Sequence, residues 1–407
     1  MKKIIFIFLL SLTLNPSFSY GKMNVSGRVL DERRFPISGI QVTINNSPTL
    51  TDKDGKFTVS DVQTPYSAVI SDLSSSTTVI YDVLTISDPE LILFRNDENR
   101  QSGKNVNIAN VDVLIDTIPN NARGILKFIS QNVSYSQEVQ VYSGDSKRQL
   151  TVSWPAGEKS INGNIVYLEK NGQKFTRYAE RNITLYNNEV FPQSIKIGIL
   201  NSYESLNLSL LTVYLPSGAY DNKQFSVWGE FLGYDRNSQI PLIFQEANIQ
   251  SSDTYVPSLL PFAFKLKVKA ECFNSKGDGF INYTYTYPGS TVNLAFEIPP
   301  VIISPSNDFK LVDNSTKFSY QEGSNAGVYV VRFTSLYPEW TTFIVTKQRE
   351  VGLPGGAGNN SNLNFNWNVQ KYIPYFSVDD FAKPKLFNNE YTYKAISFSK
   401  TYTFKTR

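Results

Sequence analysis

Apolar and polar residues alternate with a period of two along most of the chain, and Gly, Asn, Asp and Pro separate the alternating runs at intervals of about 8 to 12 residues. The clearest runs are Gln41–Ile44, Glu138–Tyr142, Asn164–Leu168, Lys265–Lys269, Tyr283–Tyr287, Tyr329–Phe333 and Tyr391–Thr403. Such runs predict short strands joined by turns, and no convincing helical pattern follows the first residues. We therefore expect an all-β chain of sandwiches.

The N-terminus has the pattern of a secretory signal peptide. Lys2 and Lys3 precede an apolar run from Ile4 to Leu14, and Ser17-Phe18-Ser19 offers small residues at a cleavage site. The apolar run reaches about half of the roughly 20 residues that a membrane-spanning helix needs. We expect residues 1–19 to be removed, no membrane span in the mature chain, and a secreted, extracellular, periplasmic or cell-envelope location.

Length and charge limit the organisation and the partners. A chain of 407 residues suits three or four domains of about 100 residues each. The signal carries two of the 39 basic residues, which leaves 37 basic against 36 acidic side chains. This balance gives no electrostatic signature for binding nucleic acid or an anionic membrane.

Residues 22–87 resemble a known family. The pattern consists of Gly27-x-Val29-x-Asp31, Pro36-Ile37-x-Gly39-Ile40-x-Val42 and Thr51-Asp52-x-x-Gly55-x-Phe57. It closely resembles the carboxypeptidase regulatory-like domain, which implies a transthyretin-like sandwich. In that family the domain is an accessory, so the resemblance brings no catalytic residues with it.

Three further sandwich units are expected. Residues 88–200 match no motif, although Asn171-Gly172 predicts a hairpin. Residues 201–298 form the next unit, which ends at Pro299-Pro300, because two prolines cannot continue a β-ladder. Residues 299–407 loosely resemble a fibronectin type III module. The predicted fold is thus a tandem array of Ig-like and transthyretin-like β-sandwiches after a cleaved signal peptide.

The absence of histidine limits the chemistry of the chain. With no His and only one Cys, Cys272, the sequence excludes Ser-His-Asp triads, Cys-His pairs and zinc sites built on His or several thiolates. The chain is therefore not a zinc carboxypeptidase. We expect no cofactor, no metal site and no catalytic residue, and we expect Cys272 to be a buried small apolar residue.

Two alternatives remain open. A glycoside hydrolase needs only two carboxylates, and the adjacent Asp379 and Asp380 are the obvious pair, although a solvated turn explains them better. An outer-membrane barrel with a periplasmic extension is the other alternative. It is disfavoured by short strands and by the C-terminal Phe404-Lys405-Thr406-Arg407, since barrels prefer an aromatic last residue.

Aromatic residues offer the remaining functional signal. Tyr283, Tyr285 and Tyr287 recur at every second position and so share one face of a predicted strand, and Trp340 lies in a later unit. Exposed rings on a sheet can stack on sugars or anchor a protein interface, although filling a core is the plainer interpretation. We predict a non-catalytic structural or binding protein whose partner is a polysaccharide or a surface protein.

Overall fold

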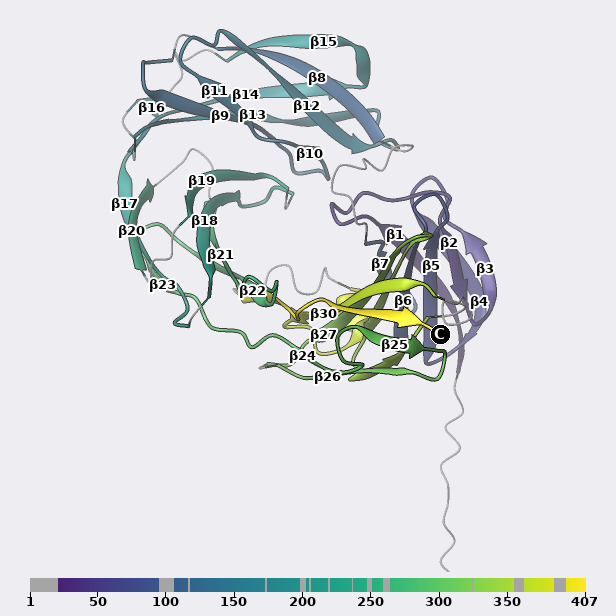
Figure 1. Ribbon diagram of the computed structural model, residues 1–407. Helices are drawn as coiled ribbons and strands as arrows, with labels where there is room; N and C mark the ends of the chain where they lie inside the picture. Colours follow the sequence, from purple (N-terminus) through teal and green to yellow (C-terminus); the bar gives the residue numbers. More distant parts are fainter. Residues whose placement is uncertain are drawn as a thin grey trace, which may run out of the picture.

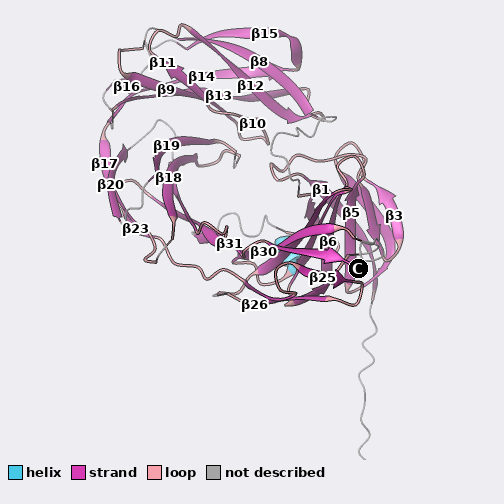
Figure 2. Ribbon diagram, in the orientation of Figure 1, coloured by secondary structure: helices cyan, strands magenta, loops and turns pink. Residues whose placement is uncertain are grey.

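The chain is built almost wholly of β-strands in the computed structural model (Figure 1). The structure describes residues 21–94, 106–115, 118–172, 174–197, 203–204, 206–218, 220–235, 237–246, 251–258, 264–323, 325–354, 362–383 and 393–407. Within these residues the one α-helix is α1 (Val378–Phe381; Figure 2), and no helix is long and apolar enough to cross a membrane. The expectation of an all-β fold is confirmed. The predicted signal peptide, residues 1–19, lies outside the described residues.

The first sandwich packs a three-stranded sheet against four strands of a much larger sheet. The small sheet has the order β4 (Lys56–Gln63), β1 (Lys22–Leu30), β7 (Glu90–Ile92). The opposing strands are β6 (Thr77–Leu84), β5 (Tyr66–Asp72), β2 (Gln41–Ile44) and β3 (Ser47–Leu50). Gly55 has a φ of +70° in the turn before β4, where a residue with a Cβ would be strained. Gly27 is also required, because a Cβ there would lie 2.5 Å from the ring of Phe57.

The second sandwich is made of two sheets of its own. One sheet has the order β10 (Tyr135–Ser136), β12 (Lys147–Pro155), β8 (Val106–Ile115), β15 (Asn188–Ile197). The other has the order β11 (Val139–Tyr142), β9 (Ala122–Ile129), β13 (Ser160–Asn171), β14 (Lys174–Tyr186), β16 (Tyr203–Glu204). Trp154 is fully buried in the core between them.

Strand β13 is buried on both faces. Ile165 and Tyr167 belong to the core of the second sandwich, whereas Val166 and Leu168 belong to the core of the third. A strand covered on both sides has no polar face, and β13 accordingly carries a continuous apolar run. The second and third sandwiches therefore share a sheet between their cores.

The third sandwich places a small sheet against one end of the large sheet. The small sheet has the order β20 (Ser251–Pro257), β17 (Leu208–Tyr214), β23 (Thr291–Asn293). The opposing strands are β19 (Gln239–Glu246), β18 (Asn222–Phe231), β21 (Phe264–Phe273) and β22 (Gly279–Thr286). Cys272 of β21 is fully buried, which confirms its expected place in the interior.

The fourth sandwich uses the middle of the large sheet. Its small sheet has the order β24 (Val301–Ser304), β26 (Lys317–Gln321), β29 (Glu350–Gly352). The opposing strands are β28 (Glu339–Thr346), β27 (Val328–Leu336), β30 (Asn364–Ile373) and β31 (Tyr393–Phe398), with β32 (Tyr402–Thr406) and β25 (Phe309–Val312) alongside β30. The ring of Phe318 lies 4.8 Å from that of Phe333 and 5.0 Å from that of Trp367.

One sheet of 14 strands runs through three of the four sandwiches. Strand β6 of the first sandwich pairs in parallel with β28 of the fourth, from Thr77 opposite Thr341 to Tyr81 opposite Val345. Strand β31 of the fourth sandwich pairs with β22 of the third. The predicted limits 22–87, 88–200, 201–298 and 299–407 remain predictions about domains. What the structure adds is that the sandwiches join edge to edge through backbone hydrogen bonds.

The four sandwiches follow an arc that brings the second one back to the first (Figure 1). At this point the guanidinium of Arg33 lies 3.9 Å from the ring centroid of Tyr135, and the Asn237 side chain donates a hydrogen bond to the Arg33 carbonyl at 3.4 Å. Strands β18, β19 and β21 lie on the side of the third sandwich that faces the middle of the arc (Figure 1). The surface of these strands is therefore presented inward.

Candidate functional site

Two of the predicted tyrosines lie on the face of the large sheet that points away from the third core. On β22, Phe280 and Asn282 are fully buried, so the alternating Tyr283 and Tyr285 point to the opposite face, where they are partly exposed. Tyr287 follows the end of the strand and is 64% exposed. The shared face of Tyr283 and Tyr285 was predicted from their spacing, whereas a binding role for them stays a prediction.

A tryptophan and two lysines complete this aromatic surface. Across the sheet, Trp228 of β18 lies opposite Lys267 of β21, which lies opposite Tyr285 of β22. Residues directly opposite each other in a sheet share a face. We call the surface formed by Trp228, Tyr283, Tyr285, Lys265 and Lys267 the aromatic platform.

The lysines of the aromatic platform lie over its tyrosine rings. The Lys265 ammonium is 4.2 Å from the ring centroid of Tyr285, and the Lys267 ammonium is 4.9 Å from that of Tyr283. Lys265 also forms an ion pair with Glu230 at 3.3 Å. These contacts hold the rings in place and put hydrogen-bond donors beside them.

Trp228 and Tyr283 each bring a polar group to the aromatic platform. The indole nitrogen of Trp228 donates a hydrogen bond to the Ser226 hydroxyl at 3.1 Å. Burial, and after it the negative charge of Glu271, raise the pKa of Tyr283 to about 12. The Tyr283 phenol is therefore neutral at physiological pH and can donate a hydrogen bond.

Trp340 lies apart from this surface. Its ring packs edge-on against Phe365 at 5.5 Å and contacts the core of the fourth sandwich. Trp340 lies on the same face of β28 as Ile344, whereas Phe343 and Val345 point to the other face, into the first core. The structure thus brings Tyr283 and Tyr285 together with Trp228 and places Trp340 on the opposite side of the large sheet.

The sequence contained a signal for Trp228. Strand β18 buries every second residue, including Phe225, Val227 and Phe231, and Trp228 falls among the intervening positions. An aromatic residue out of phase with its strand's apolar positions points away from the core. The lysines had no comparable signal, because their contacts depend on which strands are neighbours.

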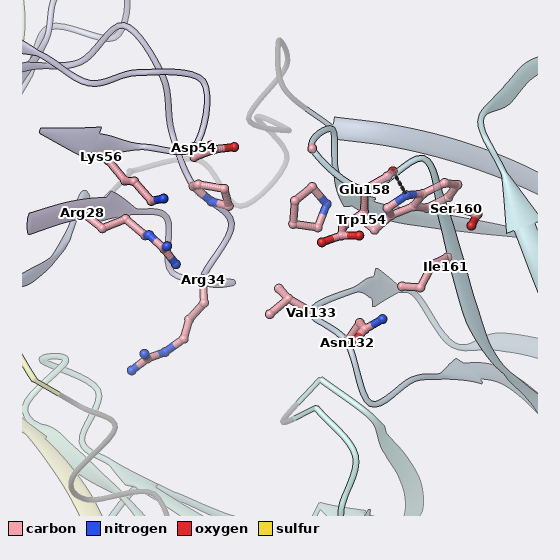
Figure 3. A pocket seen from close by; sticks show the side chains of 13 residues that line it. Arg28, Arg34, Asp54, Lys56, Asn132, Val133, Trp154, Glu158, Ser160 and Ile161 are labelled. Atoms are coloured by element: carbon pink, nitrogen blue, oxygen red, sulfur yellow. Dashed lines mark hydrogen bonds between the residues drawn. The ribbon is translucent and has the colours of Figure 1, made fainter.

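A cavity of about 320 Å³ lies between the first and second sandwiches (Figure 3). One wall carries Arg28 directly opposite Lys56, and beside them Arg34 pairs with Glu90 at 3.2 Å. The other wall carries Trp154 and Glu158; the indole nitrogen of Trp154 donates to the Glu158 carbonyl at 2.9 Å (Figure 3). Charges of both signs line the space, so it favours no single class of charged ligand.

One of the two carboxylates considered for glycoside hydrolysis, that of Asp379, has another contact. Asp379 and Asp380 lie in the single turn of α1. The carboxylate of Asp379 accepts hydrogen bonds from the backbone amide of Thr85, at 2.8 Å, and from the Thr85 hydroxyl. This contact ties α1 to the first sandwich, so Asp379 is better explained as a structural link.

Comparisons with known proteins give no family. No protein-family model and no curated protein match the chain. Solved structures that are similar include the TIE protein of Bacillus anthracis, at 12% identity and a TM-score of 0.16 over 67% of this chain and 50% of that one. The chain thus spans half the length of that protein.

Two further similar structures are surface proteins of bacteria. They are a Ca²⁺-stabilised adhesin with which an Antarctic bacterium binds ice (8% identity, TM-score 0.17, 94% of this chain and 98% of that one) and BcpA, the major pilin subunit of Bacillus cereus (9% identity, TM-score 0.15, 68% and 100%). TM-scores this low do not establish a shared arrangement, so the all-β assignment rests on the strands of the chain itself.

Proposed function

We propose that the chain is a non-catalytic secreted or cell-envelope binding protein that holds a polysaccharide on its aromatic platform. The observation that carries the proposal is the gathering of Trp228, Tyr283 and Tyr285 on one outward face, with lysine ammonium groups over the tyrosine rings. The Trp228 ring and the tyrosine faces that the lysines leave uncovered can bind the apolar faces of pyranoses, and the lysine ammonium groups can donate to their hydroxyls.

The position of the aromatic platform supports this proposal. The rings lie on a sheet whose opposite face is a closed apolar core, so they sit on rigid backbone and not on a loop. Rigid placement lowers the entropy that binding costs.

We also propose that residues 22–87 are a carboxypeptidase regulatory-like sandwich that serves as an accessory to this surface. Support comes from the resemblance in sequence and from the physical need for Gly27 and Gly55 where the motif has them. The resemblance of residues 299–407 to a fibronectin type III module has less support, because their main sheet continues into the neighbouring sandwiches.

Affinity electrophoresis tests the binding proposal. The protein is run through gels that contain laminarin, yeast mannan, xylan or polygalacturonate. We expect at least one polysaccharide to retard the wild-type protein and the Trp228→Ala/Tyr285→Ala variant to lose about tenfold or more in affinity, as hot-spot aromatics do. The matched control is Tyr255→Ala, which removes a 53% exposed tyrosine from β20 in the other sheet of the same sandwich.

Two results would contradict the proposal. One is equal retardation of the wild-type protein and the Trp228→Ala/Tyr285→Ala variant. The other is binding only to cell-surface material from which glycans have been removed, which would point to a surface protein as the partner.

A further inference from the structure

A second polar surface lies on the fourth sandwich. On β30, Phe365 and Trp367 are buried in the core, so Asn364 and Asn366 point to the opposite face, where both are exposed. Asn366 lies opposite Thr334 of β27 on one side and Thr403 of β32 on the other, and Asn364 lies opposite Lys405. We call the surface formed by Asn364, Asn366, Thr334, Thr403 and Lys405 the asparagine face.

The asparagine face lines a hollow of about 490 Å³. Asp308, Lys310 and Tyr337 also line the hollow, and 87% of the surface of Tyr337 is exposed. The loop before β25 is held in place, because the Asn307 side chain accepts a hydrogen bond from the Thr403 amide at 2.9 Å and Asp308 accepts one from the Thr403 hydroxyl.

The asparagines are a poor choice for the stability of β30. This strand is central in its sheet, with β27 on one side and β31 and β32 on the other, and asparagine is depleted in strands. Among the described residues, the amides of Asn364 and Asn366 form no hydrogen bond with other groups of the protein. Neighbouring Asn368, in contrast, donates to the Thr401 hydroxyl at 3.4 Å. Two unused amides on a rigid strand suit an external ligand.

We propose that the asparagine face is a second saccharide site, which binds a pyranose through vicinal hydroxyl groups. Each amide offers two donors and an acceptor, so Asn364 and Asn366 can accept from one hydroxyl and donate to the next. The Tyr337 ring offers an apolar surface for stacking, and Lys405 and Thr403 supply further polar groups in the lining. The ligand class rests on the proposed function, whereas the site itself is separate from the aromatic platform.

Stoichiometry of oligosaccharide binding tests this site. Mannohexaose, laminarihexaose and xylohexaose are titrated calorimetrically into the full chain, its Asn364→Ala/Asn366→Ala variant and its Trp228→Ala/Tyr285→Ala variant. We expect two hexasaccharides per wild-type chain, one per chain for each double variant, and none when all four substitutions are combined. Asn293→Ala is the matched control, since Asn293 is an exposed strand asparagine on β23, in the small sheet of the third sandwich.

The outcomes separate the two proposals. Unchanged stoichiometry and affinity in Asn364→Ala/Asn366→Ala overturn the second site and leave the aromatic platform intact. Loss of binding in that variant alone supports the second site and contradicts the platform. If none of the three hexasaccharides binds the wild-type chain, the second site is wrong, whereas the aromatic platform is decided by the affinity electrophoresis with polysaccharides. Thermal unfolding of each variant shows whether it is folded, and Asn364→Gln/Asn366→Gln, which keeps the amides, should retain part of the binding.

Discussion

Phe343 offers a direct test of whether the sandwiches depend on one another. It belongs to β28 of the fourth sandwich, yet its side chain is 5% exposed in the core of the first, where its ring lies 5.2 Å from that of Phe94. Replacing a buried Phe by Ala costs about 3–5 kcal/mol. The cost of Phe343→Ala should therefore fall on a core whose other members lie mostly 250 or more residues earlier in the sequence, since they run from Val25 to Leu93.

The matched variant is Phe333→Ala. Phe333 is fully buried on the neighbouring strand β27, but its ring packs against Phe318 and Trp367 in the core of the fourth sandwich. Both variants remove the same atoms from the same sheet, one from each face. Any difference in where stability is lost thus reports which core each ring supports.

Native-state hydrogen exchange followed by mass spectrometry locates the loss. A destabilisation of about 3–5 kcal/mol raises the population of the open state roughly 10²- to 5 × 10³-fold. In Phe343→Ala we expect this increase in peptides that cover β1, β5 and β6. In Phe333→Ala we expect it in β26, β27 and β30. If Phe343→Ala leaves exchange of the first sandwich at the wild-type rate, the shared core described above is wrong.

Two further predictions concern ionisable groups. The folded pKa of Tyr283, about 12, lies above the ordinary value of 10.0, so its contribution to stability is present below about pH 10 and is lost as pH rises from there towards 12. Between about pH 9 and about pH 11, the free energy of unfolding should therefore fall less in Tyr283→Phe than in the wild type. An equal fall in both proteins would contradict the raised pKa of Tyr283. Burial raises the pKa of Cys272 to about 11, so the thiol should react with Ellman's reagent at about pH 8 only after denaturation, and rapid reaction of the native protein would show that the thiol is accessible.

The period-two pattern predicted the fold class because most strands keep one face towards a core. In β21, burial alternates without interruption from Phe264 to Phe273, and the same alternation holds in β22 from Phe280 to Tyr283. The rule fails where both faces are covered. From Thr341 to Thr346, β28 is buried at every position, so the face on which Trp340 lies could not be inferred from alternation.

The order of the strands in the sheets could not be predicted from the sequence for a different reason. Strand β31 joins β22 although more than a hundred residues separate them, and β6 joins β28 across a still longer separation. Local patterns say which side of a strand is apolar but not which strand lies beside it. The lysines of the aromatic platform and the Thr403 contact of the asparagine face depend on such neighbours, so neither surface could be assembled from one segment.

The same long-range pairings bear on how the two proposed saccharide sites would act together. Ile281 of β22 lies opposite Ile396 of β31, and Ile396 lies opposite Tyr372 of β30, so these three residues share one side of the sheet. Alternation along each strand puts Tyr283 on the side of Ile281 and Asn366 on the side of Tyr372. Tyr283 and Asn366 therefore lie on the same side of one sheet. Backbone hydrogen bonds, and not a flexible linker, set the spacing of the sites. A polysaccharide long enough to reach both would gain avidity from that fixed spacing, whereas a short oligosaccharide would not.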